Sequence, residues 1–210
     1  MRKHKVILVS LLTATLVSGC STIASIVETS PGTSEKEQIS SEKNLHPDTV
    51  EIGTTLTVSG ISKDLTLLDN NSALAADGLY YASWGIGNCV PYTNSAGEAS
   101  DLYDGQLYIL AGESRTEESA QKNRNNWLDS AKENYEIISE TTIDCAGQEY
   151  TLITYNCTGK DNPYDTGVSA FTVCKNTAVC AELTCLEDYP GNPEETLTGF
   201  LENFSYHTEE

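Results

Sequence analysis

The feature that most constrains this fold is a succession of short, strand-like segments along residues 54–185. Eight segments are rich in β-branched and aromatic residues and are separated by turn residues: 54–60, 64–69, 79–85, 106–112, 135–143, 149–157, 168–174 and 178–185. Residues 146–148 and 175–177 suit hairpin tips. Because parallel crossovers need a dozen or more residues, these tight connections predict antiparallel pairing.

Two further segments have the apolar spacing of amphipathic helices. Residues 117–134 combine a capping-box start at Ser114 with an apolar side around Trp127. Residues 192–204 begin with Asn192 as the N-cap, followed by a proline and an apolar stripe. The order of elements predicts an α+β fold, a single domain in which one antiparallel β-sheet of short strands is covered by two amphipathic helices.

The first 20 residues have the arrangement of an export signal. Three basic residues precede the uncharged segment 6–17, which is shorter than the roughly 20 residues that span a bilayer as a helix. The sequence VSGC follows at 17–20, so this region resembles a bacterial lipoprotein precursor with its lipobox. The resemblance implies cleavage before Cys20, a diacylglycerol on its sulfur, fatty acylation such as palmitate, and a lipid anchor at the extracytoplasmic face of the cell membrane.

The composition divides the chain into four parts. We assign residues 1–19 to the signal peptide, 20–50 to the anchored cysteine and a flexible tether, 51–206 to a globular domain and 207–210 to a frayed C-terminus. The tether is rich in Ser, Thr and Glu and has too few large apolar residues to fold by itself. Such a coil has a root-mean-square reach of about 30 Å. We expect it to hold the domain away from the membrane.

The order of elements over residues 51–206, with a C-terminal amphipathic helix ending in NFSY, resembles the PsbP-like fold. That fold also occurs in small bacterial lipoproteins. The resemblance rests on element order and carries over no functional residue. It implies an accessory or binding role without catalysis, and we expect no cofactor.

The chain is strongly acidic, with a formal net charge of −19 at pH 7. Three of its 12 Lys and Arg residues precede residue 6, whereas all 31 Asp and Glu residues follow residue 20, so the mature chain is more acidic still. Such a surface repels phosphate backbones and anionic lipid headgroups. We expect no nucleic-acid partner and no membrane contact except through the diacylglycerol on Cys20.

Six cysteines remain after Cys20, and they permit up to three disulfides in any of 15 connectivities. They are Cys89, Cys145, Cys157, Cys174, Cys180 and Cys185. If residues 176–177 form a two-residue hairpin loop, Cys174 faces Val179, and Cys174 and Cys180 point to opposite faces of the sheet. These two could not bridge, and the other pairings stay open.

Histidine is too scarce for Ser-His-Asp or Cys-His catalysis, since the mature chain contains only His46 and His207. We assign no catalytic residue and do not expect an enzyme. The alternative is a small wall- or carbohydrate-active hydrolase that uses paired carboxylates such as Asp161 and Asp165. Together with Asn162 these residues are also a calcium candidate, although the segment lacks the glycine and terminal glutamate of a calcium loop, and turns explain it.

Six aromatic residues cluster between residues 80 and 108, around the segment 85–105, which we interpret as a long loop. Loops beyond about 12–15 residues are uncommon unless they are functional or disordered. Trp84, Tyr92 and Tyr103 form a candidate binding surface, because aromatic rings offer rigid area with a polar tip. Packing of these rings within the sheet is the alternative.

These features together predict a membrane-anchored extracytoplasmic lipoprotein. We expect its domain to be a noncatalytic binding or accessory module for an unknown extracytoplasmic protein or glycan.

Overall fold

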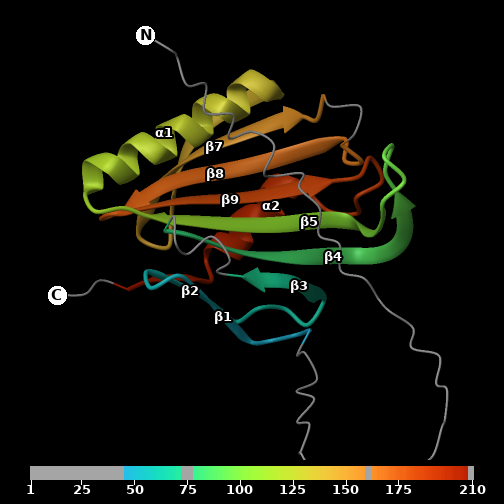
Figure 1. The fold of residues 1–210 in the computed structure, drawn as a ribbon, viewed down its shortest axis with the longest axis horizontal. Helices are drawn as coiled ribbons and strands as arrows, with labels where there is room; N and C mark the ends of the chain where they lie inside the picture. Colours follow the sequence, from blue (N-terminus) through green and yellow to red (C-terminus); the bar gives the residue numbers. More distant parts are fainter. Residues whose placement is uncertain (1–44, 72–77, 159–161, 208–210) are drawn as a thin grey trace, which may run out of the picture.

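The computed structural model describes residues 45–71, 78–158 and 162–207, and strands make up more than half of them (Figure 1). Seven strands form one antiparallel sheet, in the order β3 (Leu65–Asn71), β4 (Leu79–Thr93), β5 (Ala99–Glu113), β9 (Thr177–Cys185), β8 (Thr166–Cys174), β7 (Gln148–Asn156) and β6 (Glu136–Cys145). A second antiparallel sheet has the order β1 (Thr49–Ile52), β2 (Leu56–Ser59) and β10 (Phe204–Tyr206). The helices are α1 (Glu117–Asn134) and α2 (Pro193–Leu201). In the described ranges, neither helix is long and apolar enough to cross a membrane.

The two helices lie on opposite faces of the seven-stranded sheet. Leu128 of α1 packs against Tyr155, Phe171 and other residues on what we call the α1 face. The alternate residues of the same strands form the α2 face, which packs against α2 and the three-stranded sheet. Figure 1 shows α1 on one side of the sheet, with α2 and the strands β1 and β2 on the other. The larger core therefore lies between the two sheets.

The predicted architecture, one sheet of short strands covered by two helices, is wrong. The described residues are mostly β, with two antiparallel sheets and two short helices. One cause is the segment 85–105, which continues β4 and β5 so that each strand is 15 residues long. The other cause lies at the C-terminus, where the helix ends at Leu201 and Phe204 begins a strand that pairs with β2.

The ends of β4 and β5 extend beyond their neighbours as a two-stranded ribbon, residues 87–104, which we call the projecting hairpin. β3 pairs with β4 only as far as Ile86, and β9 pairs with β5 only from Gly105. Pro91 is tolerated here because this part of β4 has no partner strand on its outer side. The interpretation of the segment 85–105 as a long loop is wrong, because its backbone forms an exposed antiparallel pair.

Both helix starts depend on side-chain caps. Oδ1 of Asn192 accepts hydrogen bonds from two backbone N–H groups of the first turn of α2, at 2.9 and 3.3 Å, which confirms the predicted cap. At α1 the cap is Thr116, whose Oγ1 accepts a hydrogen bond from the N–H of Ser119 at 3.2 Å. The predicted cap at Ser114 is therefore two residues too early, whereas the predicted helix range 117–134 is confirmed.

The β8–β9 hairpin turns at Lys175 and Asn176, so Cys174 pairs with Thr177 and not with Val179 as predicted. The observed partner, Thr177, lies two residues before the predicted partner. Because side chains alternate between the two faces of a sheet, a shift of two residues leaves their directions unchanged. Cys180 packs on the α1 face, and Val179 and its alternate neighbours pack on the α2 face. The prediction that Cys174 and Cys180 point to opposite faces is confirmed.

The signal peptide, Cys20 and the tether up to residue 44 lie outside the described residues. Two residues assigned to the tether contact the edge strand β3. The N–H of Leu67 donates to the carbonyl of Leu45 at 2.8 Å, and Nδ1 of His46 lies 3.0 Å from the carbonyl oxygen of Leu65. The first strand begins at Thr49, two residues before the assigned domain boundary.

Candidate functional site

The structure separates the three aromatic residues of the predicted binding surface. Trp84 has no exposed surface, and its ring packs edge-on against Phe200 in the α2-face core, with ring centroids 5.3 Å apart. Tyr103 lies over Gly85, where a Cβ would come within 2.5 Å of the ring. Tyr92 lies on the projecting hairpin. The prediction that Trp84 contributes to an exposed surface is wrong, because Trp84 is a core residue.

Two of the calcium and carboxylate candidates, Asn162 and Asp165, lie in the connection between β7 and β8. Asp161 is outside the described residues. Oδ1 of Asn162 accepts a hydrogen bond from the N–H of Tyr164 at 3.1 Å, and Oδ2 of Asp165 accepts one from the N–H of Glu187 at 2.8 Å. Among the residues that the structure describes, no three His, Cys, Asp or Glu side chains are close enough to hold a metal ion together.

One line of polar side chains crosses the α1 face of the sheet. In successive strand pairs Asp69 faces Ser83, Ser83 faces Tyr108, Tyr108 faces Glu182, and Glu182 faces Ser169. Directly paired residues point to the same face of a sheet, so five neighbouring strands contribute to this line. We call it the polar row. Sequence reasoning missed it, because its members come together only through the pairing register.

At the β3–β5 end, the polar row lies beside α1 and not beneath it, since α1 packs mainly on β8 and β9. We call Asp69, Ser83 and Tyr108 the open half. The rings of Tyr81 and Tyr108 stack, with centroids 5.6 Å apart and an interplanar angle of 25°. The hydroxyl of Tyr81 donates to Oδ2 of Asp69 at 3.1 Å. Asp69 and Tyr108 are both half-buried, so this end of the row reaches the surface.

Ser83 is the unusual member of the open half. It has no exposed surface, and its Oγ has no hydrogen-bond partner in the described structure. Burial, and then its charged and polar neighbours, raises the pKa of Tyr108, so this phenol stays protonated and keeps its donor. Together with the neighbouring Tyr81, the open half thus combines a carboxylate, two tyrosine rings and a hydroxyl that is unpaired among the described residues.

Beneath α1 the polar row contains a buried carboxyl group, Glu182, which with Ser169 forms the covered half. The hydroxyls of Tyr155 and Ser169 both donate to Oε1 of Glu182, the latter at 3.1 Å. Burial raises the pKa of Glu182, and the two hydrogen bonds oppose this rise. The ring of Tyr155 stacks on Tyr135 at a centroid distance of 4.1 Å. The covered half is therefore part of the packing between helix and sheet.

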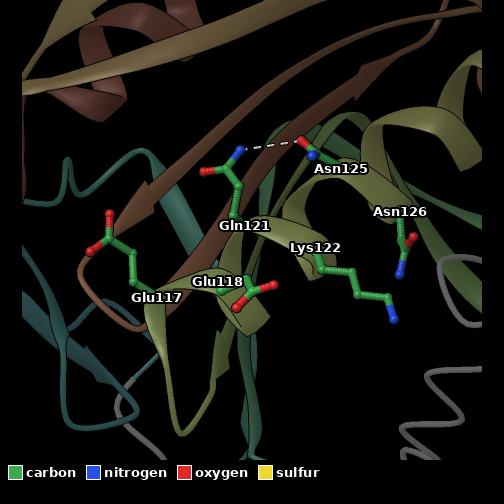
Figure 2. A pocket seen from close by; sticks show the side chains of 6 residues that line it. All are labelled: Glu117, Glu118, Gln121, Lys122, Asn125 and Asn126. Atoms are coloured by element: carbon green, nitrogen blue, oxygen red, sulfur yellow. Dashed lines mark hydrogen bonds between the residues drawn. The ribbon is translucent and has the colours of Figure 1, made fainter.

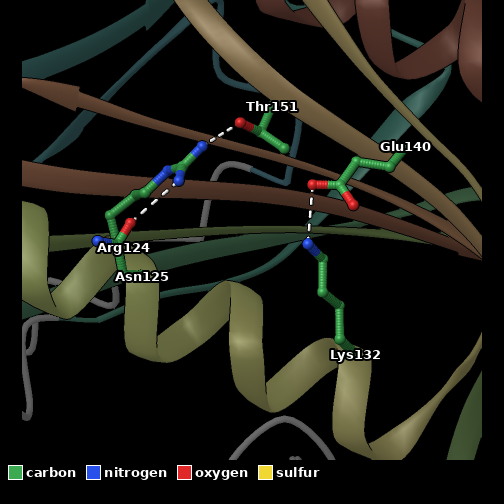
Figure 3. Close-up of polar contacts among 5 residues, drawn as sticks. All are labelled: Arg124, Asn125, Lys132, Glu140 and Thr151. Carbon is green, nitrogen blue, oxygen red and sulfur yellow. Dashed lines mark hydrogen bonds and ion pairs between the residues drawn. The ribbon is translucent and has the colours of Figure 1, made fainter.

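Polar contacts attach α1 to the β6–β7 end of the sheet (Figure 3). Nζ of Lys132 lies 2.8 Å from Oε1 of Glu140 on β6, and the guanidinium of Arg124 donates to the hydroxyl of Thr151 on β7. Both partners lie on the α1 face. These contacts, together with Leu128, explain why α1 lies over one half of the sheet face and leaves the other half open.

The outer surface of α1 has a hollow that is open to solvent, and all its lining residues belong to this one helix (Figure 2): Glu117, Glu118, Gln121, Lys122, Asn125 and Asn126. Gln121 donates to Asn125 at 3.3 Å, one helical turn away. No second element contributes to the lining. We interpret this region as the solvated face of the helix, and not as a site.

The six cysteines of the domain are all unpaired in the described structure. Cys89 is exposed on the projecting hairpin, and the other five are buried or half-buried. Burial raises the pKa of Cys157 and the pKa of Cys185 to about 12 each. These thiols therefore remain protonated at neutral pH and behave as small apolar core residues.

No family model matches the chain, and no curated protein is significantly similar to it in sequence. Solved structures that are similar include a crystal structure from Bacteroides thetaiotaomicron, at 11% identity and a TM-score of 0.47, with 78% of this chain and 50% of that chain covered. The chain thus spans half the length of that protein. They also include the solution structure of cyanobacterial PsbP (CyanoP) from Synechocystis, at 13% identity and a TM-score of 0.36. That match covers 66% of this chain and 92% of the CyanoP chain. A PsbP-like protein is thus among the structural neighbours, but with TM-scores below 0.5 neither likeness assigns a site or an activity.

Proposed function

We propose that this chain is a lipoprotein anchored through Cys20 at the extracytoplasmic face of the cell membrane, and that its domain is a noncatalytic binding or accessory module. The lipobox at residues 17–20 supports the anchor. The polar tether that follows would allow the domain to reach a partner about 30 Å away.

The observation that carries the binding role is the hydroxyl of Ser83, which has no hydrogen-bond partner in the part of the chain that the structure describes. Buried polar groups nearly always have a hydrogen-bond partner, so an unpaired one calls for an explanation. Ser83 lies between Asp69 and Tyr108, both of which reach the surface. A carboxylate and a tyrosine ring that reach the surface beside this hydroxyl suit a binding surface.

The hydrolase alternative requires two carboxyl groups on either side of one bond. Asp69 and Glu182 lie three strands apart in the polar row, which is about 14 Å at about 4.8 Å per strand. Glycoside hydrolases place their two carboxyl groups about 5–9.5 Å apart. No feature of the row favours hydrolysis, and we prefer binding.

Metabolic labelling with a palmitate analogue tests the anchor. We expect the label on the wild-type chain in the membrane fraction, and we expect Cys20→Ala to remove the label and release the chain. Labelling that survives Cys20→Ala, or wild-type chain without lipid in the cytosol, would contradict the proposal.

Crosslinking on intact membranes followed by pull-down tests the binding role. We expect recovery of a specific extracytoplasmic component, reduced by Asp69→Asn and unchanged by Glu118→Gln on the outer surface of α1. Turnover of a wall polymer by the purified chain would overturn the noncatalytic assignment.

A further inference from the structure

We propose that the open half of the polar row binds a basic segment of a protein partner, seating a lysine or arginine side chain against Asp69, Tyr81 and Tyr108. This inference rests on the proposed binding function and assigns the chemistry of the partner.

The first argument is charge complementarity. The chain from Asp64 to Ser114, which includes β3, β4 and β5, contains seven Asp and Glu residues and no Lys, Arg or His. The described cations nearest in sequence are Lys63 and Arg115, at either end of this stretch. Three further cations, including Lys132, belong to α1. The segment that forms β3, β4 and β5 thus has a negative formal charge, which favours a cationic partner and repels an acidic one.

The second argument is the chemistry of the open half itself. The stacked rings of Tyr81 and Tyr108 offer aromatic surface, which attracts a cation by its negative face. The hydrogen bond from Tyr81 fixes the carboxylate of Asp69 beside these rings. An ionised carboxylate can accept several hydrogen bonds, so Asp69 can also accept bonds from an ammonium or guanidinium group. Aromatic rings around a carboxylate form a suitable receptor for such a group.

The third argument is the hydroxyl of Ser83, which lies between Asp69 and Tyr108 and has no hydrogen-bond partner among the described residues. A cation has only donors to offer, and the buried hydroxyl of Ser83 can accept one of them once the side chains around it move aside. A neutral glycan could also pair with this hydroxyl. The glycan would gain nothing from the negative charge of the surrounding strands, and for this reason we favour the basic segment.

The test is a titration of the purified full-length chain, held in detergent, with a fluorescent mixed Lys–Arg peptide, followed by anisotropy. Peptides of the same length that are neutral or acidic, and a soluble wall oligosaccharide, serve as comparisons. We expect saturable binding of the basic peptide alone, weakened by added salt.

The variants locate the site. We expect Asp69→Asn to weaken binding about tenfold, and Ser83→Ala to weaken it about threefold without lowering the midpoint of thermal unfolding. Glu118→Gln removes the same charge from the outer surface of α1 (Figure 2) and should leave binding unchanged. Circular dichroism of each variant verifies the fold.

Three results would overturn the inference: no saturable binding of the basic peptide at low salt, equal losses of affinity in Asp69→Asn and Glu118→Gln, or preferential binding of the oligosaccharide.

The proposed binding function and the proposed site for a basic segment fail in distinguishable ways. If a membrane partner is recovered by pull-down but is insensitive to Asp69→Asn, the binding function stands and this site is wrong. If no partner and no lipid are found, the binding function itself fails.

Discussion

The two faces of the seven-stranded sheet are built from alternate residues of the same strands, yet they differ in character. On β5 and β9 the α2 face presents Leu107, Ile109, Ala181 and Leu183, all without appreciable exposure. Between these residues, the α1 face presents members of the polar row. A face covered by both a helix and a second sheet has to be apolar, whereas a face covered over half its width can keep polar groups. We therefore attribute stability mainly to the α2 face, and the proposed binding would use the open half of the α1 face.

The largest expected effect concerns thiol reactivity, and it tests whether the region beneath α1 is as closed as the α2 face. Because the pKa of Cys185 is about 12 in the fold, we expect its alkylation at pH 8 to be roughly 10³-fold slower in the folded chain than in urea. Cys157, on the side of α1, has the same raised pKa and should be protected similarly. Time-resolved mass spectrometry with iodoacetamide measures both rates.

Cys89 is the exposed thiol of the described structure and serves as the internal control, since it should react first. Fast alkylation of Cys157 together with slow alkylation of Cys185 would mean that α1 opens readily.

The second prediction compares two leucines of the same strand. Leu107 is 1% exposed on the α2 face, and Leu110 is half-buried on the α1 face. We expect Leu107→Ala to lower the free energy of unfolding by about 2–5 kcal/mol and Leu110→Ala to lower it by less than about 2 kcal/mol. Urea unfolding measures both values. Equal losses would mean that the two faces are packed alike.

The third prediction concerns the pH dependence of stability that arises from Glu182. Burial raises the pKa of this carboxyl group in the fold above its ordinary value of 4.5. The folded state therefore binds this proton more tightly than the unfolded state does. The resulting stabilisation is complete below the ordinary pKa and is lost as the pH rises through the raised pKa of the folded state. In this window the free energy of unfolding falls by at most about 1.4 kcal/mol per pH unit. The titratable groups around it have raised pKa values too and stay neutral in this range: Tyr108, Tyr135, Tyr155, Cys157 and Cys180.

Glu182→Gln isolates this contribution, because it keeps the shape of the side chain and removes the titration. The difference in unfolding free energy between wild type and variant should change with pH across this window, as measured by urea unfolding at several pH values. A difference that is constant with pH would show that Glu182 is not buried as the structure has it.

The smallest expected effect is at the exposed ion pair between α1 and β6. The side chains of Lys132 and Glu140 are 35% and 46% exposed. Glu140→Gln should cost less than about 1 kcal/mol, because solvent screens such pairs. The same urea experiment measures it at low and high salt. A loss above about 2 kcal/mol would indicate that this contact, and not the apolar packing of Leu128, holds α1 on the sheet.

The sequence allowed prediction of the features that depend on local signals. Residue type predicts the cap at Asn192 and the antiparallel hairpins. The alternation of side chains along a strand predicts the opposite orientations of Cys174 and Cys180. The projecting hairpin was missed because the segment 85–105 was interpreted as a long loop. Gly85 leaves room for the ring of Tyr103, and Pro91 lies on an unpaired edge.

The polar row could not be predicted, because it depends on pairing register across five strands. One signal was present in the sequence. Glu182 is the sole charged residue within residues 178–185, a segment that is otherwise apolar or neutral. A charge at such a position indicates a buried polar network, but the identity of Asp69, Ser83 and Tyr108 as its companions requires the fold.

Amide chemical-shift mapping of the isotope-labelled chain, titrated with the basic peptide, tests the central assignment most directly. The account predicts that shifts concentrate at Asp69, Ser83 and Tyr108 and their strand neighbours, while Leu107, Leu183 and the rest of the α2 face stay unchanged. Shifts centred on α2 or on the tip of the projecting hairpin, or no shifts at saturating peptide, would contradict it.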